Sequence, residues 1–346
     1  MSIFDRRPGL RWAVPVAAGA LVLAGAMVGT VGASADSGLP AKTAEQLLVD
    51  LQSREGTPLS GTVVATADLG LPALPMPAGS SSDLTALASG SHTIRVWSDG
   101  PERARAAIIG TADEADVIRN GKDVWMWSSS EATVEHSVVP DRDASAAPEP
   151  GLTLPSTPQE AADMVVQALD STTSISTSGV DQVAGRPVYE LILTPRQDAT
   201  LVAKVVVAMD SETGVPLRVQ VFSTQMADPA FEVGFTSVDF SRPDASVFDF
   251  TPPPGATVTE HSAADHGQPG ALGLGSADAA RPTIVGTGWS QVAIAALPAD
   301  PENANPVLDA LPRTSGAWGS GRVLSGTLVS AILTDDGRIA LGAVSP

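Results

Sequence analysis

The sequence predicts an α+β fold dominated by one large antiparallel β-sheet. Two observations lead to this prediction. About ten short segments alternate apolar and polar residues with a period of two, and only two segments have clear helical periodicity. A sheet of this width has to curl, close or be covered, because its apolar face would otherwise be an aggregation hazard. The 346 residues allow one large domain or two smaller ones.

The charge and the absence of cysteine exclude several classes of protein. The formal net charge is −19, and the first 35 residues carry +2, so the remainder carries −21. Such an acidic surface repels phosphate backbones, and we therefore expect no nucleic-acid partner. Because the chain has no cysteine, it can have no disulfide, no thiol catalysis, no cysteine-ligated metal and no lipidated N-terminal cysteine.

Residues 1–35 have the pattern of a signal peptide or an N-terminal anchor. Three arginines precede an apolar run over 12–31, and a small-x-small cleavage pattern follows at 33–35. The apolar run is close to the roughly 20 residues that span a bilayer, so an uncleaved anchor is the alternative to cleavage. In both cases we expect the body of the protein to be exported, either to the extracytoplasmic cell envelope or as a secreted protein.

Two helices are predicted from their caps and apolar stripes. Thr43 and Gln46 form a capping box for a helix over 43–53. The second helix has Thr157 as its cap and Pro158 at its first position. Glu160 closes its capping box, and its stripe is Ala161, Met164, Val165, Ala168 and Leu169.

The expected strands fall into two groups, separated by a loop over 140–155. The Pro-, Gly- and Ser-rich residues 69–82 predict a mobile loop, followed by a short helix at 83–88. Asn120-Gly121 is the strongest hairpin signal. The first group of strands is 61–67, 91–98, 102–109, 113–119, 123–128 and 132–138. The second group is 179–184, 187–194, 201–210, 216–223 and 230–238.

The second group predicts a sheet with one dry face and one wet face. The dry side chains are Tyr189, Leu191, Leu193, Val205, Val207, Met209, Leu217, Val219, Val221, Phe231, Val233 and Phe235. In one interpretation the curled sheet and two helices pack into a solid core. In the other, the cover is incomplete and a groove remains for an acyl chain or an apolar peptide, which small dry-face side chains favour.

Three stretches carry a resemblance to a known superfamily. They are Asn-Gly-Lys-Asp-Val-Trp-Met-Trp at 120–127, Asp-Ser-Glu-Thr-Gly-Val-Pro-Leu at 210–217 and Phe-Asp-Phe-Thr-Pro-Pro-Pro-Gly-Ala at 248–256. In order and spacing they resemble motifs of the LolA/RseB (MucB)-like superfamily of lipoprotein carriers and envelope regulators. The resemblance implies a half-open antiparallel β-barrel with helices as a lid, which binds acyl chains or an extracytoplasmic protein segment without catalysis.

With this resemblance, we expect four parts. Residues 1–35 are the signal peptide or anchor, and 40–258 form the LolA-like half-barrel. Residues 259–283 are a flexible linker, and 284–346 form a small C-terminal α/β module. The module is expected to hold a helix near 306–311 and two or three strands.

The expected ligand site is an apolar groove on the concave face of the half-barrel. Its predicted lining is Trp125, Trp127, Leu191, Leu193, Val205, Val207, Val219 and Val221. For the two tryptophans, core packing is the alternative. The expected partner is a lipid or a lipidated protein, because buried acyl surface contributes about 0.8 kcal/mol per CH₂. The alternative partner is an anti-sigma factor or other membrane protein.

No catalytic residue, metal or cofactor is predicted. The sequence has no Gly-rich phosphate loop between a strand and a helix and no Gly-x-Ser-x-Gly elbow. His92 and His136 lie in expected strands, where a surface or packing role is the natural interpretation. His261, Asp265 and His266 could form at most a weak metal site, because a flexible segment must be ordered on binding.

Overall fold

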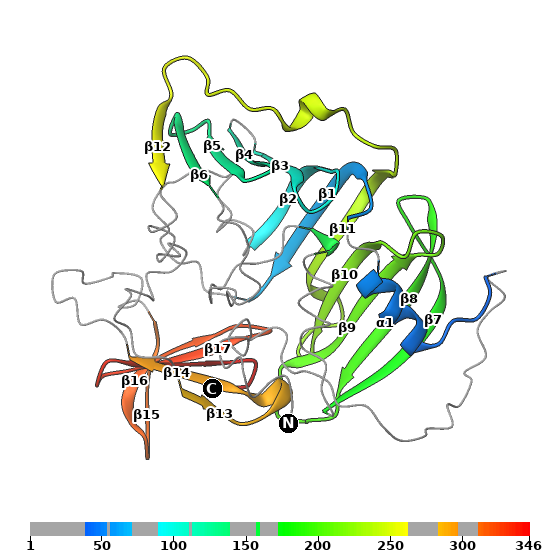
Figure 1. Cartoon of the computed structure of the whole chain (residues 1–346). Coiled ribbons are helices and arrows are strands. Elements are labelled where there is room, and N and C mark those ends of the chain that lie inside the picture. Colours follow the sequence, from blue (N-terminus) through cyan, green and yellow to red (C-terminus); the bar gives the residue numbers. More distant parts are fainter. Residues whose placement is uncertain are drawn as a thin grey trace, which may run out of the picture.

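The computed structural model describes residues 39–53, 56–70, 89–110, 113–138, 157–159, 172–261, 283–296 and 311–346, which form two β-sheets (Figure 1). Several expectations lie outside these residues: the segment 1–35, most of the loop 69–82, the helix 83–88, the loop 140–155, nearly all of the second helix, most of the linker 259–283 and the helix near 306–311. Within the described part of the chain, no helix is long and apolar enough to cross a membrane.

The first sheet has twelve strands in the order β12-β6-β5-β4-β3-β2-β1-β11-β10-β9-β8-β7. All neighbours are antiparallel except β12 and β6, and the sheet is open, with β12 and β7 at its edges. One half consists of β1 (Leu59–Asp68), β2 (Ser89–Ser98), β3 (Arg103–Ile109), β4 (Glu114–Asn120), β5 (Asp123–Ser128), β6 (Thr133–Val138) and β12 (Thr257–His261). The other half consists of β7 (Thr173–Val183), β8 (Arg186–Pro195), β9 (Val202–Asp210), β10 (Pro216–Ser223) and β11 (Pro229–Asp239).

The predicted helix and hairpin signals are confirmed where the chain is described. α1 (Ala44–Ser53) begins at the expected capping box, in which Thr43 N donates to Gln46 Oε1 (2.9 Å) and Gln46 N to Thr43 Oγ1 (3.3 Å). The β4–β5 hairpin turns at Gly121, whose φ of +66° is a conformation that glycine adopts without steric cost. The predicted strands of both groups form, and β7 begins six residues before the expected position.

Two differences from the predictions concern pairing that the local pattern does not reveal. Residues 257–261, expected to span the end of the half-barrel at 258 and the start of the linker at 259, form β12 and pair in parallel with β6, far away in sequence. The early part of β7 is Thr-Ser-Ile-Ser-Thr-Ser, which lacks an apolar alternation and is a strand because its backbone pairs with β8. The pairing of β12 with a strand far away in sequence leaves no periodic signal, and the polar residues of early β7 give no apolar alternation that a search could recognise.

The second sheet holds six strands rather than the expected two or three. Its order is β13-β14-β18-β17-β16-β15, and all of its pairs are antiparallel. Its strands are β13 (Thr283–Val285), β14 (Val292–Ala296), β15 (Arg313–Gly316), β16 (Gly319–Ser325), β17 (Ser330–Thr334) and β18 (Arg338–Gly342), with the 3₁₀ helix η5 (Gly288–Ser290) after β13. Gly, Ser and Arg are frequent in β15 and β16, so these strands were invisible to a search for apolar alternation.

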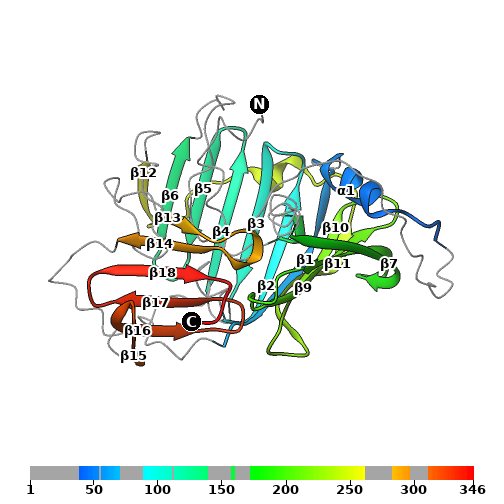
Figure 2. The same cartoon turned by 90° about the horizontal axis from the view of Figure 1, so that it is seen from below.

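Hydrogen bonds connect the C-terminal residues that carry the second sheet to the first sheet. Thr327 Oγ1 donates to Asp68 O at the end of β1 (2.9 Å), and Thr200 Oγ1 donates to Ala343 O (3.0 Å). Trp289 Nε1 donates to Thr173 Oγ1 at the start of β7 (2.9 Å). In Figures 1 and 2 the second sheet lies on one side of β2–β6, below them in the view of Figure 1.

The register divides the first sheet into two faces, because directly paired residues lie on the same face. We call the face that carries Val63, Ile94 and Val219 the inner face. Its core includes Leu47 and Leu51 of α1 together with Trp289 and Leu328 from the C-terminal residues. The opposite, outer face is crossed by residues 240–256, which contain the 3₁₀ helix η4 (Ala245–Phe248) and run above β3–β6 in Figure 1.

Candidate functional site

The six aliphatic residues predicted to line the groove lie together on the inner face. Leu191 pairs with Val207 and Val207 with Val219, while Leu193, Val205 and Val221 form a second cross-strand row. All six are buried, with exposures between 0% and 4%. In this half of the sheet they are core residues, packed with α1 and with the C-terminal Trp289.

The two tryptophans lie on the opposite, outer face. Cross-strand pairing connects Trp125 in series with Ile118, Arg105, Trp97 and Ser60. The next residue of β1, Gly61, pairs with the inner-face Val96, so Ser60 and the residues in series with it lie on the outer face. The Trp125 ring stacks on His136 with centroids 3.8 Å apart and lies 5.5 Å from the Phe250 ring of the crossing segment. Trp125 and Trp127 are therefore not part of the surface that the six aliphatic residues form.

The alternation within β5 reveals that its tryptophans share a face, but it cannot tell which face is inner. That depends on how many strands separate β5 from the core and on the register between them. The inner positions in this half include Ala106, Val117 and Met126, none of which was predicted to line the groove. For Met126, the sequence signal was its position between the two tryptophans of β5, which puts it on the face opposite to theirs.

The inner face becomes progressively exposed from β2 toward β5. A single cross-strand row joins Val96, Ala106, Val117 and Met126. Val96 is 5% exposed, Ala106 and Val117 are partly buried, and Met126 is 42% exposed. The face that is completely covered in β8–β11 is thus open to solvent at β5, where it presents Val124, Met126 and Ser128.

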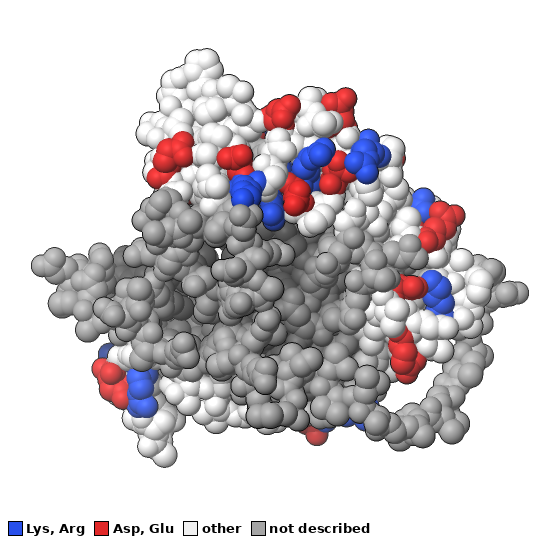
Figure 3. Space-filling view, viewed as in Figure 1, with Lys and Arg blue, Asp and Glu red and all other residues white. Residues whose placement is uncertain are grey.

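Arg119 lies at the end of this surface that is next to the β4–β5 turn. It lies on the inner face two positions from Val117, beside Ala104 and Val124, and its Nε donates to Gly121 O (3.1 Å). Figure 3 shows acidic and basic side chains interspersed over the described surface on this side of the molecule. The surface over β3–β5 therefore combines an apolar floor with a cation at the hairpin end.

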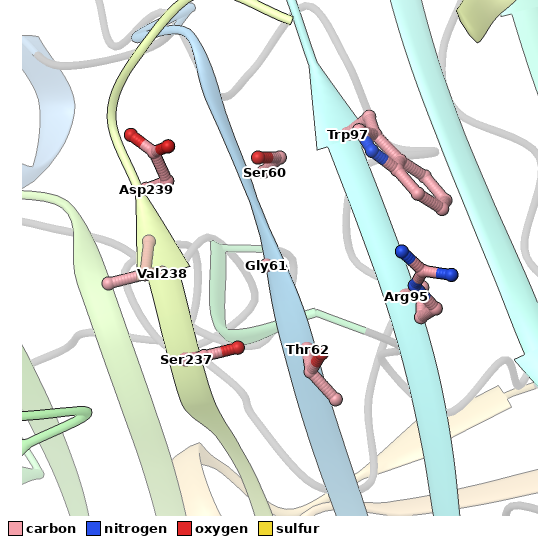
Figure 4. A pocket seen from close by; sticks show the side chains of 8 residues that line it. All are labelled: Ser60, Gly61, Thr62, Arg95, Trp97, Ser237, Val238 and Asp239. Atoms are coloured by element: carbon pink, nitrogen blue, oxygen red, sulfur yellow. The ribbon is translucent and has the colours of Figure 1, made fainter.

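A pocket of about 240 Å³ lies on the outer face of β1, β2 and β11 (Figure 4). It is lined by Ser60, Gly61, Thr62, Arg95, Trp97, Ser237, Val238 and Asp239. The Arg95 guanidinium lies 5.0 Å from the centre of the Trp97 ring, a cation–π contact. Gly61 is required at its floor, because a Cβ there would lie 2.3 Å from Ser237 O. The polar lining does not suit an acyl chain.

The 210–217 motif forms a tightly hydrogen-bonded hairpin rather than a reactive group. The Asp210 carboxylate, 1% exposed, is ion-paired with Arg186 and accepts hydrogen bonds from Thr213 N and Thr213 Oγ1, both at 2.8 Å. Burial raises the pKa of Asp210, but the bonds from Arg186 and Thr213 lower it by more, so the carboxyl group is held below its ordinary value. Within the described residues, no cluster of three or more His, Asp or Glu side chains could hold a metal ion.

No protein-family model matches the chain, and no curated protein was found as a relative. Among solved structures, the chain is similar to the MucA/MucB complex of Pseudomonas aeruginosa, with 17% identity, 87% of this chain and 94% of that chain covered and a TM-score of 0.44. It is similar to an uncharacterized conserved protein from Thermus thermophilus, with 11% identity, 63% and 99% coverage and a TM-score of 0.36. It is also similar to a LolA superfamily protein from Nitrosomonas europaea, with 12% identity, 61% and 99% coverage and a TM-score of 0.24. These likenesses concern the fold alone.

Proposed function

We propose that this chain is an exported, non-catalytic binding protein that holds an apolar ligand against the inner face of β3–β5. The ligand class is an acyl chain, belonging to a lipid or to a lipidated protein. The export part of the proposal rests on the signal-peptide pattern of residues 1–35. The binding part rests on the open apolar row that ends at Met126.

The exposure gradient along the row Val96–Ala106–Val117–Met126 supports the binding role most directly. An apolar sheet face left open to water costs free energy, about 25 cal/mol per Å² of surface that a ligand could bury. The same face in β8–β11 is covered by α1 and the C-terminal residues, whereas its part at Met126 of β5 is exposed to solvent. Exposed apolar surface of this kind is typical of a binding site.

The side chains at this surface match an amphipathic ligand. Ala106 and Val117 are small and leave room above the sheet, while Met126 has a flexible side chain that adapts to different chains. Arg119 at the hairpin end would face the polar head of the ligand. Each methylene that leaves water contributes about 0.8 kcal/mol to binding, so eight buried methylenes contribute about 6 kcal/mol before the cost of association.

The test uses the full-length protein purified from membranes and analysed by native mass spectrometry. We expect the wild-type protein to carry bound lipid and Met126→Glu to lose most of it, because a carboxylate in the apolar floor must be desolvated. The matched control is Ile109→Glu, since Ile109 is similarly exposed (45%) but lies on the outer face of β3. It should retain the lipid.

Two results would contradict the proposal. One is a wild-type protein without lipid whose thermal stability does not change on delipidation. The other is equal lipid loss in Met126→Glu and Ile109→Glu. If a single-pass membrane protein co-purifies instead and lipid is absent, the occupant is a protein segment, and the acyl-chain proposal is wrong.

A further inference from the structure

Two histidines of the chain form reciprocal pairs with glutamates across the β6–β12 ladder. On the outer face, His136 of β6 meets Glu260 of β12, with 2.6 Å between Nδ1 and Oε2. On the inner face, His261 of β12 lies 3.7 Å from Glu135 of β6, measured from Nε2 to Oε2. These cross-strand pairs add to the backbone pairing of the parallel edge strand.

The His136 ring is hydrogen-bonded to a carboxylate at each of its nitrogens. Its Nε2 lies 2.9 Å from Asp123 Oδ1 of β5, opposite the Glu260 contact. A neutral imidazole has one N–H, so it can donate to only one of these carboxylates, whereas an imidazolium donates to both. The neighbouring groups are the stacked Trp125 ring and Phe250 of the crossing segment, and Asp249 of that segment is bonded to Asn120.

The electrostatics agree with a protonated ring. Burial lowers the pKa of His136, but the hydrogen bonds to Asp123 and Glu260 and their charges raise it by more, so the net shift is upward. Because the pKa is raised in the folded state, the stability that the protonated His136 contributes is fully present below the ordinary histidine pKa of about 6.5. This stability is lost as pH rises through the raised pKa.

We propose that His136 is a proton-controlled latch that fastens the edge strand β12, and with it the end of the crossing segment 240–256, to β5 and β6. The protonated ring bridges Asp123 and Glu260. The neutral ring leaves one of these carboxylates without a donor and facing a nitrogen lone pair, which loosens β12. Since Glu135 of β6 pairs with Met126, the latch adjoins the open end of the inner face.

Amide hydrogen exchange of the full chain, corrected for the intrinsic pH dependence of exchange, tests the latch. We expect the protection of residues 257–261 to fall about threefold between pH 5.5 and pH 8.5, because Asp123 and Glu260 are 53% and 67% exposed and solvent screens their contacts with the ring. The protection of β9 should stay constant over the same range. Equal protection of β12 at both pH values would overturn the latch.

A pair of matched variants separates the latch from general electrostatic effects. In Glu260→Gln the side-chain amide can accept from the protonated ring or donate to the neutral ring, so the protection of β12 should no longer depend on pH. Glu102→Gln removes an exposed carboxylate from the turn before β3 and should keep the wild-type pH dependence. A pH dependence that survives in Glu260→Gln would show that the His136–Glu260 contact does not control β12. This readout requires no ligand and is independent of the proposed binding function.

Discussion

Replacing Asp210 with alanine is expected to lower the free energy of unfolding by about 2–4 kcal/mol. The carboxylate is buried and satisfies four donors besides its ion pair with Arg186 Nε: Arg186 Nη2 (3.1 Å), Glu212 N (3.2 Å), and Thr213 N and Oγ1 (both 2.8 Å). Without it, Glu212, which is exposed, is the remaining ion-pair partner of the Arg186 guanidinium among the described residues. Chemical denaturation of wild type and variant at pH 7 measures the difference.

The control is Asp336→Ala in the hairpin between β17 and β18. Asp336 also pairs with an arginine, Arg338, but both side chains are more than half exposed. We expect the control to leave the free energy of unfolding nearly unchanged.

Because the pKa of Asp210 is lowered in the folded state, its contribution to stability is present above the ordinary carboxyl pKa and lost as pH falls through the lowered value. The difference between wild type and Asp210→Ala should therefore shrink in acid, and a difference that is constant down to acid pH would contradict this assignment.

Leu191→Ala is expected to cost about 2–5 kcal/mol of folding stability. Leu191 is 0% exposed and lies between Thr177 and Val207 in the ladder, so its removal leaves a cavity in the core. Denaturant unfolding measures this loss, and Met126→Ala, at a half-open position, should cost much less. The contrary outcome is informative: a Leu191→Ala protein of normal stability that has lost its lipid would place the ligand over β8–β10.

Much of the fold can be predicted from the sequence because its signals are local. The capping box at Thr43, the Asn120-Gly121 turn and the alternation in β8–β11 each act over a few residues and appear as expected. β12 could not be predicted in this way, since its partner β6 precedes it by more than a hundred residues. The polar strands β15 and β16 were missed because they lack an apolar alternation.

The candidate site could be predicted only in its chemistry. The sequence correctly indicates a dry sheet face made of small aliphatic side chains, and Leu191, Val207 and Val219 share it. It does not indicate how much of that face other elements cover, because covering depends on tertiary packing. Nor can it place Trp125 relative to Leu191, since the eight strand pairings between β5 and β8 decide whether the two residues share a face.

The most direct test of the binding role is photo-cross-linking with a fatty acid that carries a diazirine on its chain. The full-length protein is irradiated with the probe, and labelled residues are mapped by tandem mass spectrometry. Labels concentrated on Ala106, Val117 and Met126, and displaced by unlabelled fatty acid, are the predicted result. Labels on Trp125 and Trp127 instead, or labelling that unlabelled fatty acid does not displace, would contradict binding at the inner face.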